Sequence, residues 1–247
     1  MEILSVKNIT KSFGENKIIE DISLTLKKGE LVSLLGVSGA GKTTLFNCIS
    51  GIEKADSGRI ILQGKDISAI PGQISYMLQK DLLLPYKKIV DNVALPLLLS
   101  GKKKTEAREI ALSHFAEFGI DGTENYYPSQ LSGGMRQRAA LLRTYLASKG
   151  VALLDEPFSA LDTITKGAMH SWYLSVMEKI DLSTIFITHD IDEAVLLSDR
   201  ILILSGKPGK ITDEIIIDQK KPRDRDFNLT PEFLKYKKQV INALGNI

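Results

Sequence analysis

Eight consecutive residues, Gly36 to Thr43, follow the pattern glycine, four residues, glycine, lysine, threonine. Glycines at these places let the backbone turn tightly and aim its N–H groups at anionic oxygens. The lysine then reaches the terminal phosphates of a nucleotide, and the threonine hydroxyl binds Mg²⁺. The alternative is a glycine-rich turn with an incidental lysine, but an apolar run precedes this turn and a helical pattern follows it. The residues predicted to bind the nucleotide here are Gly36, Val37, Ser38, Gly39, Ala40, Gly41, Lys42, Thr43 and Thr44.

A second chemical signal is the acidic pair Asp155 and Glu156, which follows the apolar run Val151 to Leu154. Such a run predicts a buried strand, and its end places both acids at the carboxyl edge of a sheet, beside the glycine turn. We expect Asp155 to hold Mg²⁺ and Glu156 to orient or deprotonate an attacking water. A strand that ends in two solvated acids is the alternative. The glycine turn in the same chain makes that alternative less favourable.

The elements that must position these residues alternate between strands and helices. Continuous apolar runs that predict buried strands are Leu31–Leu35, Val151–Leu154, Ser183–Thr188 and Ile201–Leu204. Helical patterns cover Lys42–Ser50, with Gly51 at its end, and Ser132–Ser148. This alternation predicts an α/β domain with a mainly parallel sheet.

Two further regions flank that sheet in the sequence. Alternating segments at Glu2–Ile9 and Ile22–Leu26 predict an antiparallel region with a turn at residues 14–16, and Arg59–Leu62 and Ile74–Leu78 predict further strands. A helical pattern over residues 90–118, interrupted at Pro96 and near Gly101, predicts a helical subdomain inserted at about residues 80–148. We expect an ATPase domain over residues 1–219 and a linker with a terminal helix over 220–247. Thr230 and Pro231 mark the start of that helix, and about Leu244 its end.

Composition excludes several classes of protein. The 247 residues are 43% apolar and 25% charged, which is ordinary for a globular chain. The net charge of +2 gives no field that would attract nucleic acid. Cys48 is the one cysteine, so no disulfide forms within the chain. It falls on the helix after the glycine turn, where we expect a buried apolar role. Apolar runs such as Val93–Leu99 are shorter than the roughly 20 residues of a membrane helix.

The stretch Leu131-Ser132-Gly133-Gly134-Met135-Arg136-Gln137-Arg138 resembles the signature of the ATP-binding subunits of ABC transporters. The resemblance covers about residues 1–215. It implies a P-loop ATPase core, an antiparallel β subdomain and an inserted helical subdomain. In this family the signature caps the ATP held by the opposite protomer, with a serine hydroxyl and glycine N–H groups at a helix N-terminus. Ser132, Gly133 and Gly134 are the residues that this implies.

The same resemblance implies roles for four other residues. Phe13 matches the aromatic residue that stacks on adenine, where the family often has tyrosine; alone, it would be read as a core residue. Gln79 matches the glutamine that senses the metal and the membrane partner. Asp162 lies in the loop that crosses the dimer interface; the alternative is a helix-capping turn, and the two are compatible. His189 matches the histidine at the γ-phosphate, whereas His114 and His170 lie outside every motif and are expected to be structural or surface residues.

The resemblance also implies the partners. They are a second copy of the chain in an ATP-sandwich dimer, integral membrane permease subunits and, indirectly, a solute-binding protein, with no nucleic acid. The chain is then expected to hydrolyse ATP with Mg²⁺ at the cytoplasmic face of the cell membrane, as a peripheral subunit.

Weaker matches predict the solute group. Segments 84–94, 192–200, 207–211 and 222–225 resemble the importers of nitrate, sulfonates and taurine. The alternatives are an importer of another small solute such as a thiamine precursor, an exporter or lipid-extracting complex, and an ABC ATPase that acts on DNA or ribosomes. A P-loop kinase or a GTPase-like switch is disfavoured by the signature and by the acidic pair followed by Pro157.

Overall fold

The chain begins with a long antiparallel hairpin. In the computed structural model, which describes residues 1–221, 223 and 225–245, β1 (Glu2–Phe13) pairs with β2 (Asn16–Lys27). β1 also pairs with β4 (Ser57–Leu62), which pairs with the short β5 (Lys65–Asp66). The predicted antiparallel region is confirmed, but both hairpin strands are longer than predicted. The pairing of β1 with β2 contains register shifts, which interrupt the apolar alternation in the sequence. The two strands pair again after each shift, so the hairpin extends further than the alternation does.

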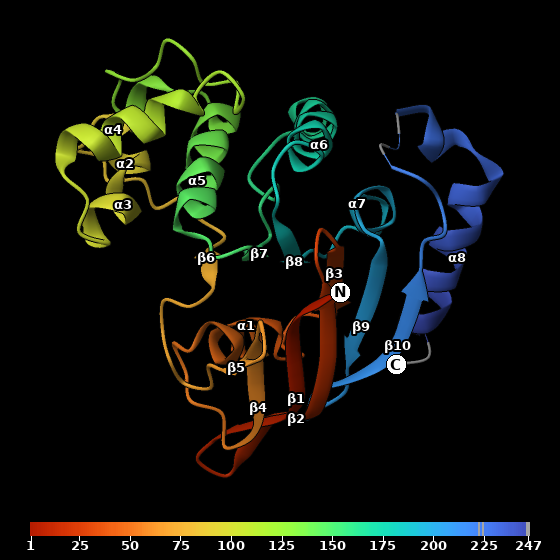
Figure 1. Ribbon diagram of the computed structural model, residues 1–247. Helices are drawn as coiled ribbons and strands as arrows, with labels where there is room; N and C mark the ends of the chain where they lie inside the picture. Colours follow the sequence, from red (N-terminus) through yellow and green to blue (C-terminus); the bar gives the residue numbers. More distant parts are fainter. Residues whose placement is uncertain (222, 224, 246–247) are drawn as a thin grey trace.

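A second sheet has six strands in the order β10-β9-β3-β8-β7-β6 (Figure 1). All neighbours are parallel except β9 and β10, which confirms the predicted mainly parallel sheet. Its strands are β3 (Leu31–Gly36), β6 (Ser75–Met77), β7 (Val151–Asp155), β8 (Ser183–Ile187), β9 (Arg200–Ser205) and β10 (Lys210–Ile216). β6 is shorter than the predicted Ile74–Leu78 because its one neighbour, β7, pairs with only three of its residues.

Both faces of this sheet are covered. On one face, Val32 and Leu34 pack in a cluster with Leu4 of the antiparallel sheet and Phe46 of α1 (Lys42–Ser50). On the other face, Leu154 and the helices α5 (Gly133–Ala147) and α6 (Thr163–Met177) share a second apolar cluster. The central strands are buried along their whole length, as continuous apolar runs require.

A helical segment separates β6 from β7 in the sequence and stands apart from the antiparallel sheet in Figure 1. It contains α2 (Ile89–Val93), α3 (Leu95–Leu99), α4 (Lys104–Ser113), η1 (Pro128–Gln130) and α5. Pro96 lies in the first turn of α3, where its missing N–H costs no hydrogen bond. The predicted helical pattern to Phe118 is too long, since α4 ends at Ser113 and single turns follow to Gly119, whose φ is 64°.

The C-terminal part packs against the edge of the six-stranded sheet. α7 (Ile191–Leu197), η2 (Arg225–Leu229) and α8 (Pro231–Gly245) share a third apolar cluster with Leu35 and β9 (Figure 1). The predicted terminal helix is confirmed, and Phe233 N donates to the Thr230 hydroxyl at its start. Two residues of the predicted 222–225 segment, Pro222 and Asp224, lie outside the described residues. Across the described ranges, no helix has the length and apolar character needed to cross a membrane.

Candidate functional site

The glycine turn joins β3 to α1 and depends on two of its glycines. Gly41 has φ 96° at the N-cap of α1, and a Cβ there would lie 2.5 Å from Cγ2 of Ile19. A Cβ on Gly36 would lie 2.2 Å from the carbonyl oxygen of Leu204 on β9. Both positions therefore exclude larger residues. The first N–H groups of α1 are left facing the turn, where helix termini bind phosphate.

Lys42 folds back over this turn. Its Nζ donates to the carbonyl oxygens of Gly36 at 2.7 Å and Val37 at 3.0 Å. Burial lowers the pKa of Lys42, while the charges of Glu156 and Asp155 act in the opposite direction. The ammonium thus lies between the turn and the two acids, within reach of a phosphate bound at the turn.

Asp155 is the buried acid of the site. Its side chain sits at the end of β7, and Oδ2 accepts hydrogen bonds from the Tyr76 hydroxyl at 3.3 Å and from Thr43 Oγ1 at 3.4 Å. Burial raises the pKa of Asp155, and the hydrogen bond from Tyr76 is the largest influence that lowers it. Tyr76 was not among the predicted site residues, because a tyrosine within a short strand carries no sequence signal of its own.

Glu156 joins two other predicted residues. Its Oε2 accepts from Nε2 of Gln79 at 2.9 Å, and its Oε1 lies 3.0 Å from Nδ1 of His189. The backbone of Glu156 has φ 46°, and its N–H donates to the carbonyl oxygen of Ile187 at the end of β8. A non-glycine residue in this conformation is strained, and such strain occurs where a side chain must be aimed. Glu156, Gln79 and His189 therefore form one hydrogen-bonded set.

Lys42, Asp155, Gln79 and Glu156 line a cavity of about 310 Å³, whereas His189 lies outside it. The lining residues are Ile18, Ser38, Gly39, Gly41, Lys42, Thr43, Thr44, Gln79, Asp155, Glu156 and Ile187. The structure thus brings together half of the predicted nucleotide and metal residues, whereas Gly36, Val37 and Ala40 of the glycine turn do not line the cavity. Two lining residues, Ile18 and Ile187, were not predicted, because an isoleucine in a strand has no motif that separates it from the core.

Mg²⁺ fits the oxygen atoms present. This ion prefers octahedral oxygen ligands, keeps several waters, and usually binds through one or two carboxylates together with substrate phosphates. Thr43 Oγ1, Asp155 and the side chain of Gln79 all face the cavity. Within the described part of the chain, no cluster of three or more His, Cys, Asp or Glu side chains forms a metal site. The geometry suits an ion that protein and phosphate share.

The remaining predicted residues lie outside this cavity. Phe13 is 48% exposed at the end of β1, with Lys11 Nζ 5.0 Å from its ring centroid. Ser132 caps α5 by accepting from Met135 N at 3.3 Å, and Gly133 and Gly134 form the first turn of that helix. Asp162 caps α6, with Thr165 N donating to its Oδ1 at 3.0 Å. The signature and the Asp162 turn thus do not complete the site of their own chain.

The signature helix α5 is instead tied to the segment after Gln79. Arg136 Nε donates to Oδ2 of Asp81 at 3.2 Å, and Arg143 Nη1 donates to the carbonyl oxygen of Leu82 at 2.9 Å. Burial lowers the pKa of Arg143, and the nearby charge of Asp81 opposes this. These links were not predicted, since they join residues far apart in the sequence.

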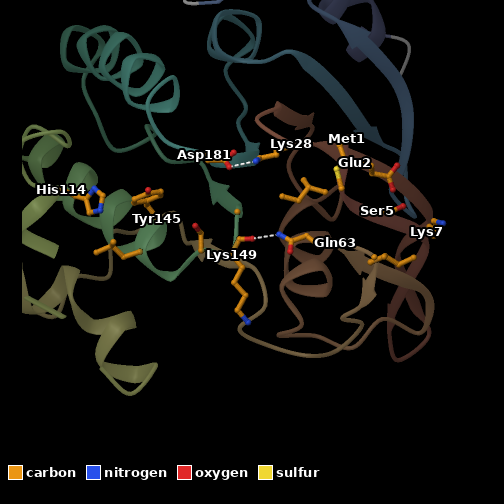
Figure 2. A pocket seen from close by; sticks show the side chains of 16 residues that line it. Met1, Glu2, Ser5, Lys7, Lys28, Gln63, His114, Tyr145, Lys149 and Asp181 are labelled. Atoms are coloured by element: carbon orange, nitrogen blue, oxygen red, sulfur yellow. Dashed lines mark hydrogen bonds and ion pairs between the residues drawn. The ribbon is translucent and has the colours of Figure 1, made fainter. Parts of the chain in front are cut away.

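A larger cavity of about 1030 Å³ lies at the amino edge of the parallel strands. Figure 2 shows two contacts among its lining residues: Lys28 pairs with Asp181 at 2.7 Å, and Gln63 donates to the backbone carbonyl oxygen of Lys149 at 3.1 Å. No residue of the glycine turn or the acidic pair lines it. The glycine turn and the acidic pair line the smaller cavity instead.

Known proteins match this chain over most of its length. The formylaminopyrimidine import ATP-binding protein ThiZ of Halalkalibacterium halodurans is 46% identical over 208 residues, which are 84% of this chain and 81% of the relative. The taurine import ATP-binding protein TauB of Escherichia coli K12 is 35% identical over 247 residues, which are 98% of this chain and 97% of the relative.

A solved structure matches as well. The dimeric structure of the bacterial ABC transporter cassette MJ0796 covers 88% of this chain and 100% of its own, with a TM-score of 0.74 and 29% identity. The same cassette has a dimeric post-hydrolysis structure with ADP and Pi, at a TM-score of 0.73. The family model described as ABC transporter matches residues 19–159 of this chain. The chain therefore belongs to the ABC transporter family, as one of its ATP-binding and ATP-hydrolysing subunits.

Proposed function

We propose that this chain drives the import of a small solute from the cytoplasmic face of the membrane, as a peripheral subunit bound to membrane permeases. The observation that supports this most is the match to ThiZ and TauB, both import proteins, across most or nearly all of the chain. Their names give different solutes, a formylaminopyrimidine and taurine. We therefore propose a small solute of one of these classes, taurine and related sulfonates or a thiamine-type pyrimidine, selected by the permease and its solute-binding protein.

In the proposed ATP site, the chain's own groups bind and orient the triphosphate. Backbone N–H groups of the glycine turn and the start of α1 face the β- and γ-phosphates, and Lys42 exchanges its two carbonyl partners for phosphate oxygens. Phe13 offers its exposed ring to the adenine. Thr43, Asp155 and Gln79 would hold Mg²⁺, which would supply positive charge beside the phosphates.

Glu156 is the proposed base. Its carboxylate is held on both oxygens, by Gln79 and by His189, which fixes it toward the cavity. In this position it orients the attacking water and accepts its proton. His189 is 63% exposed, so its ring is accessible to the γ-phosphate that a bound nucleotide would place there.

A second copy of the chain completes the proposed site. Ser132 is exposed at the N-terminus of the 15-residue helix α5, and Asp162 is exposed at the start of α6. Both therefore face away from their own cavity and are accessible to a partner. A two-fold arrangement lets each signature cap the other protomer's ATP.

The proposed permease surface lies beside Gln79. A cavity of about 730 Å³ there is lined by residues 79–83 and by Glu156, Ser159 and His189, among others. Leu82 and Tyr86 in this segment are 51% and 73% exposed and so offer apolar surface to a partner. A helix of the membrane subunit that packed on them would contact the same segment that carries Gln79.

A co-purification experiment tests this function. A tagged Glu156→Gln chain, expressed in its native cell, is purified from gently solubilised membranes with ATP, and its partners are identified by mass spectrometry. We expect a multi-span permease and, through it, the solute-binding protein that names the solute. Adding Tyr86→Glu should remove the permease, whereas Ile216→Glu, on the exposed far edge at β10, should retain it. Recovery of ribosomal or DNA-repair proteins without a membrane chain would refute the transport function.

A further inference from the structure

Two helices that lead out of the ATP site are fastened to each other. α6 begins directly after Asp162, and α7 begins directly after Asp190, the neighbour of His189. Lys166 Nζ on α6 donates to Oδ2 of Asp190 at 3.1 Å. One helical turn further along α6, Nε2 of His170 lies 2.8 Å from Oε1 of Glu193 on α7. Two polar contacts, one turn apart, therefore hold the helices in a fixed register.

The inner contact is buried. The side chains of His170 and Glu193 are only 9% and 3% exposed, so neither can find water if its partner is removed. The contact joins Nε2 of the ring directly to the carboxylate, with no room for water between them at 2.8 Å. Losing one member would leave a buried polar group without a partner, which is costly.

This buried pair touches both loops of the ATP site. The ring of Phe158, two residues after Glu156, meets the His170 ring edge-on with centroids 5.0 Å apart. On the other side, Glu193 N donates to Oδ1 of Asp190 at 3.2 Å. A packed and hydrogen-bonded path therefore runs from the Glu156 turn through His170 and Glu193 to the residue beside His189.

Neither member of the pair belongs to the chemistry itself. His170 and Glu193 do not line the ATP cavity, and the sequence predicts His170 to be a structural or surface residue. Their place in the fold is nevertheless specific, because the turn at residues 159–162 is the part of α6's loop exposed to a second protomer. α6 follows that turn directly, and its contacts to Asp190 and Glu193 connect it to α7 and to the residue beside His189.

We propose that His170 and Glu193 are positioning residues that couple the turn Ser159–Asp162 to His189, so that docking of the second protomer sets the histidine at the γ-phosphate. This inference rests on the proposed function of the ATP site. It gives the chain an internal link between dimer closure and the geometry of hydrolysis.

The test measures single-turnover hydrolysis and ATP affinity of the purified full chain with Mg²⁺. In His170→Leu we expect the rate constant to fall by at least roughly tenfold, with the Kd for ATP changed by less than about twofold. His170→Gln, which can still donate to Glu193, should recover most of the rate. Val6→Ala, a buried substitution in the antiparallel sheet, serves as the control for a general loss of stability.

Combination with His189→Ala separates positioning from plain stabilisation. If His170 acts through His189, His170→Leu should cause no further loss of rate in the His189→Ala chain. An equal loss in both backgrounds would overturn the proposal. Lys166→Met removes the outer, more accessible contact and should cause a smaller loss of rate, which should also disappear in the His189→Ala chain. This variant tests the proposal even if His170→Leu folds poorly.

Failure of the proposed ATP site would look different. Wild-type chain that does not hydrolyse ATP, or Glu156→Gln that hydrolyses it normally, would refute the site itself. Suppose instead that wild type hydrolyses ATP and Glu156→Gln does not. Full activity in both His170→Leu and Lys166→Met would then refute only the coupling.

Discussion

At the scale of single residues, one tyrosine hydroxyl contacts the buried acid of the site. Tyr76 donates to Oδ2 of Asp155, and this hydrogen bond favours the ionised carboxylate against the burial that raises its pKa. The ring of Tyr76 is held by an edge contact with Phe46, at 5.8 Å between centroids. The position of the hydroxyl is therefore set by the core under α1 rather than by the nucleotide.

Removing this hydroxyl should shift the acid side of the pH profile. Tyr76→Phe raises the pKa of Asp155 further, and a carboxyl binds Mg²⁺ only above its pKa. As the pH falls, the Tyr76→Phe chain should therefore lose activity at a higher pH than wild type does. ATPase rate against pH at several Mg²⁺ concentrations measures this, with the exposed Tyr126→Phe as control. An unchanged acid limb would show that the hydrogen bond does not act on Asp155.

At the scale of elements, Arg223 fastens the C-terminal segment to α7. Its guanidinium is 5% exposed and donates to the carbonyl oxygens of Val195 at 2.8 Å, Ser198 at 2.6 Å and Ile217 at 3.3 Å. The first two carbonyls belong to the end of α7, where helices leave acceptors unpaired. Burial lowers the pKa of Arg223 to about 10. Arg223 thus joins the C-terminal end of α7 to Ile217, the residue directly after β10.

Replacing this arginine should destabilise the fold. Arg223→Met leaves several buried carbonyl groups unpaired, and we expect a loss of roughly 2–4 kcal/mol in the free energy of unfolding. Urea denaturation followed by circular dichroism provides the measurement. Arg59→Met, on the exposed side of β4, is the matched control and should change little. Equal stability of the two variants would mean that water satisfies these carbonyls once the arginine is gone.

The elements best predicted from the sequence are those with local end signals. α1 has the predicted bounds because Gly41 and Gly51, at φ 96° and 78°, mark its two ends. β10 gave no such signal, because an edge strand with one partner tolerates the exposed polar residues of Lys210–Ile216. α6 was likewise missed as a range, since its apolar residues do not follow a clear single-face pattern.

Among the site residues, too, those with a local sequence motif were predicted and those without one were not. The glycine turn and the acidic pair are short motifs whose spacing fixes their geometry, and their residues do meet in one cavity. Tyr76 reaches Asp155 across 79 residues of sequence, and His170 reaches Glu193 across 23. Contacts of this kind depend on the packing of whole elements, so no local pattern could have indicated them.

At the scale of the whole molecule, ATP should determine whether two copies associate. Glu156→Gln removes the base while keeping the groups that bind phosphate, so the chain should hold ATP and form a stable dimer. Size-exclusion chromatography with light scattering should show monomer without nucleotide and dimer with excess MgATP. Adding Ser132→Arg blocks the signature surface, and that double variant should remain monomeric while still binding ATP. Monomer under all conditions would contradict the two-protomer site.

The strand order has a consequence for how the protein is made. β3, which carries the glycine turn, lies between β8 and β9, so its two neighbours are Ser183–Ile187 and Arg200–Ser205. A ribosome delivers β3 early and those neighbours late. Until β8 and β9 are synthesised, β3 has neither of its neighbours in the sheet. Pairing between segments so far apart in the sequence is also slow to form. We therefore expect the nucleotide site to form only after β8 and β9 have been synthesised, with Leu31–Gly36 left without its sheet neighbours until then.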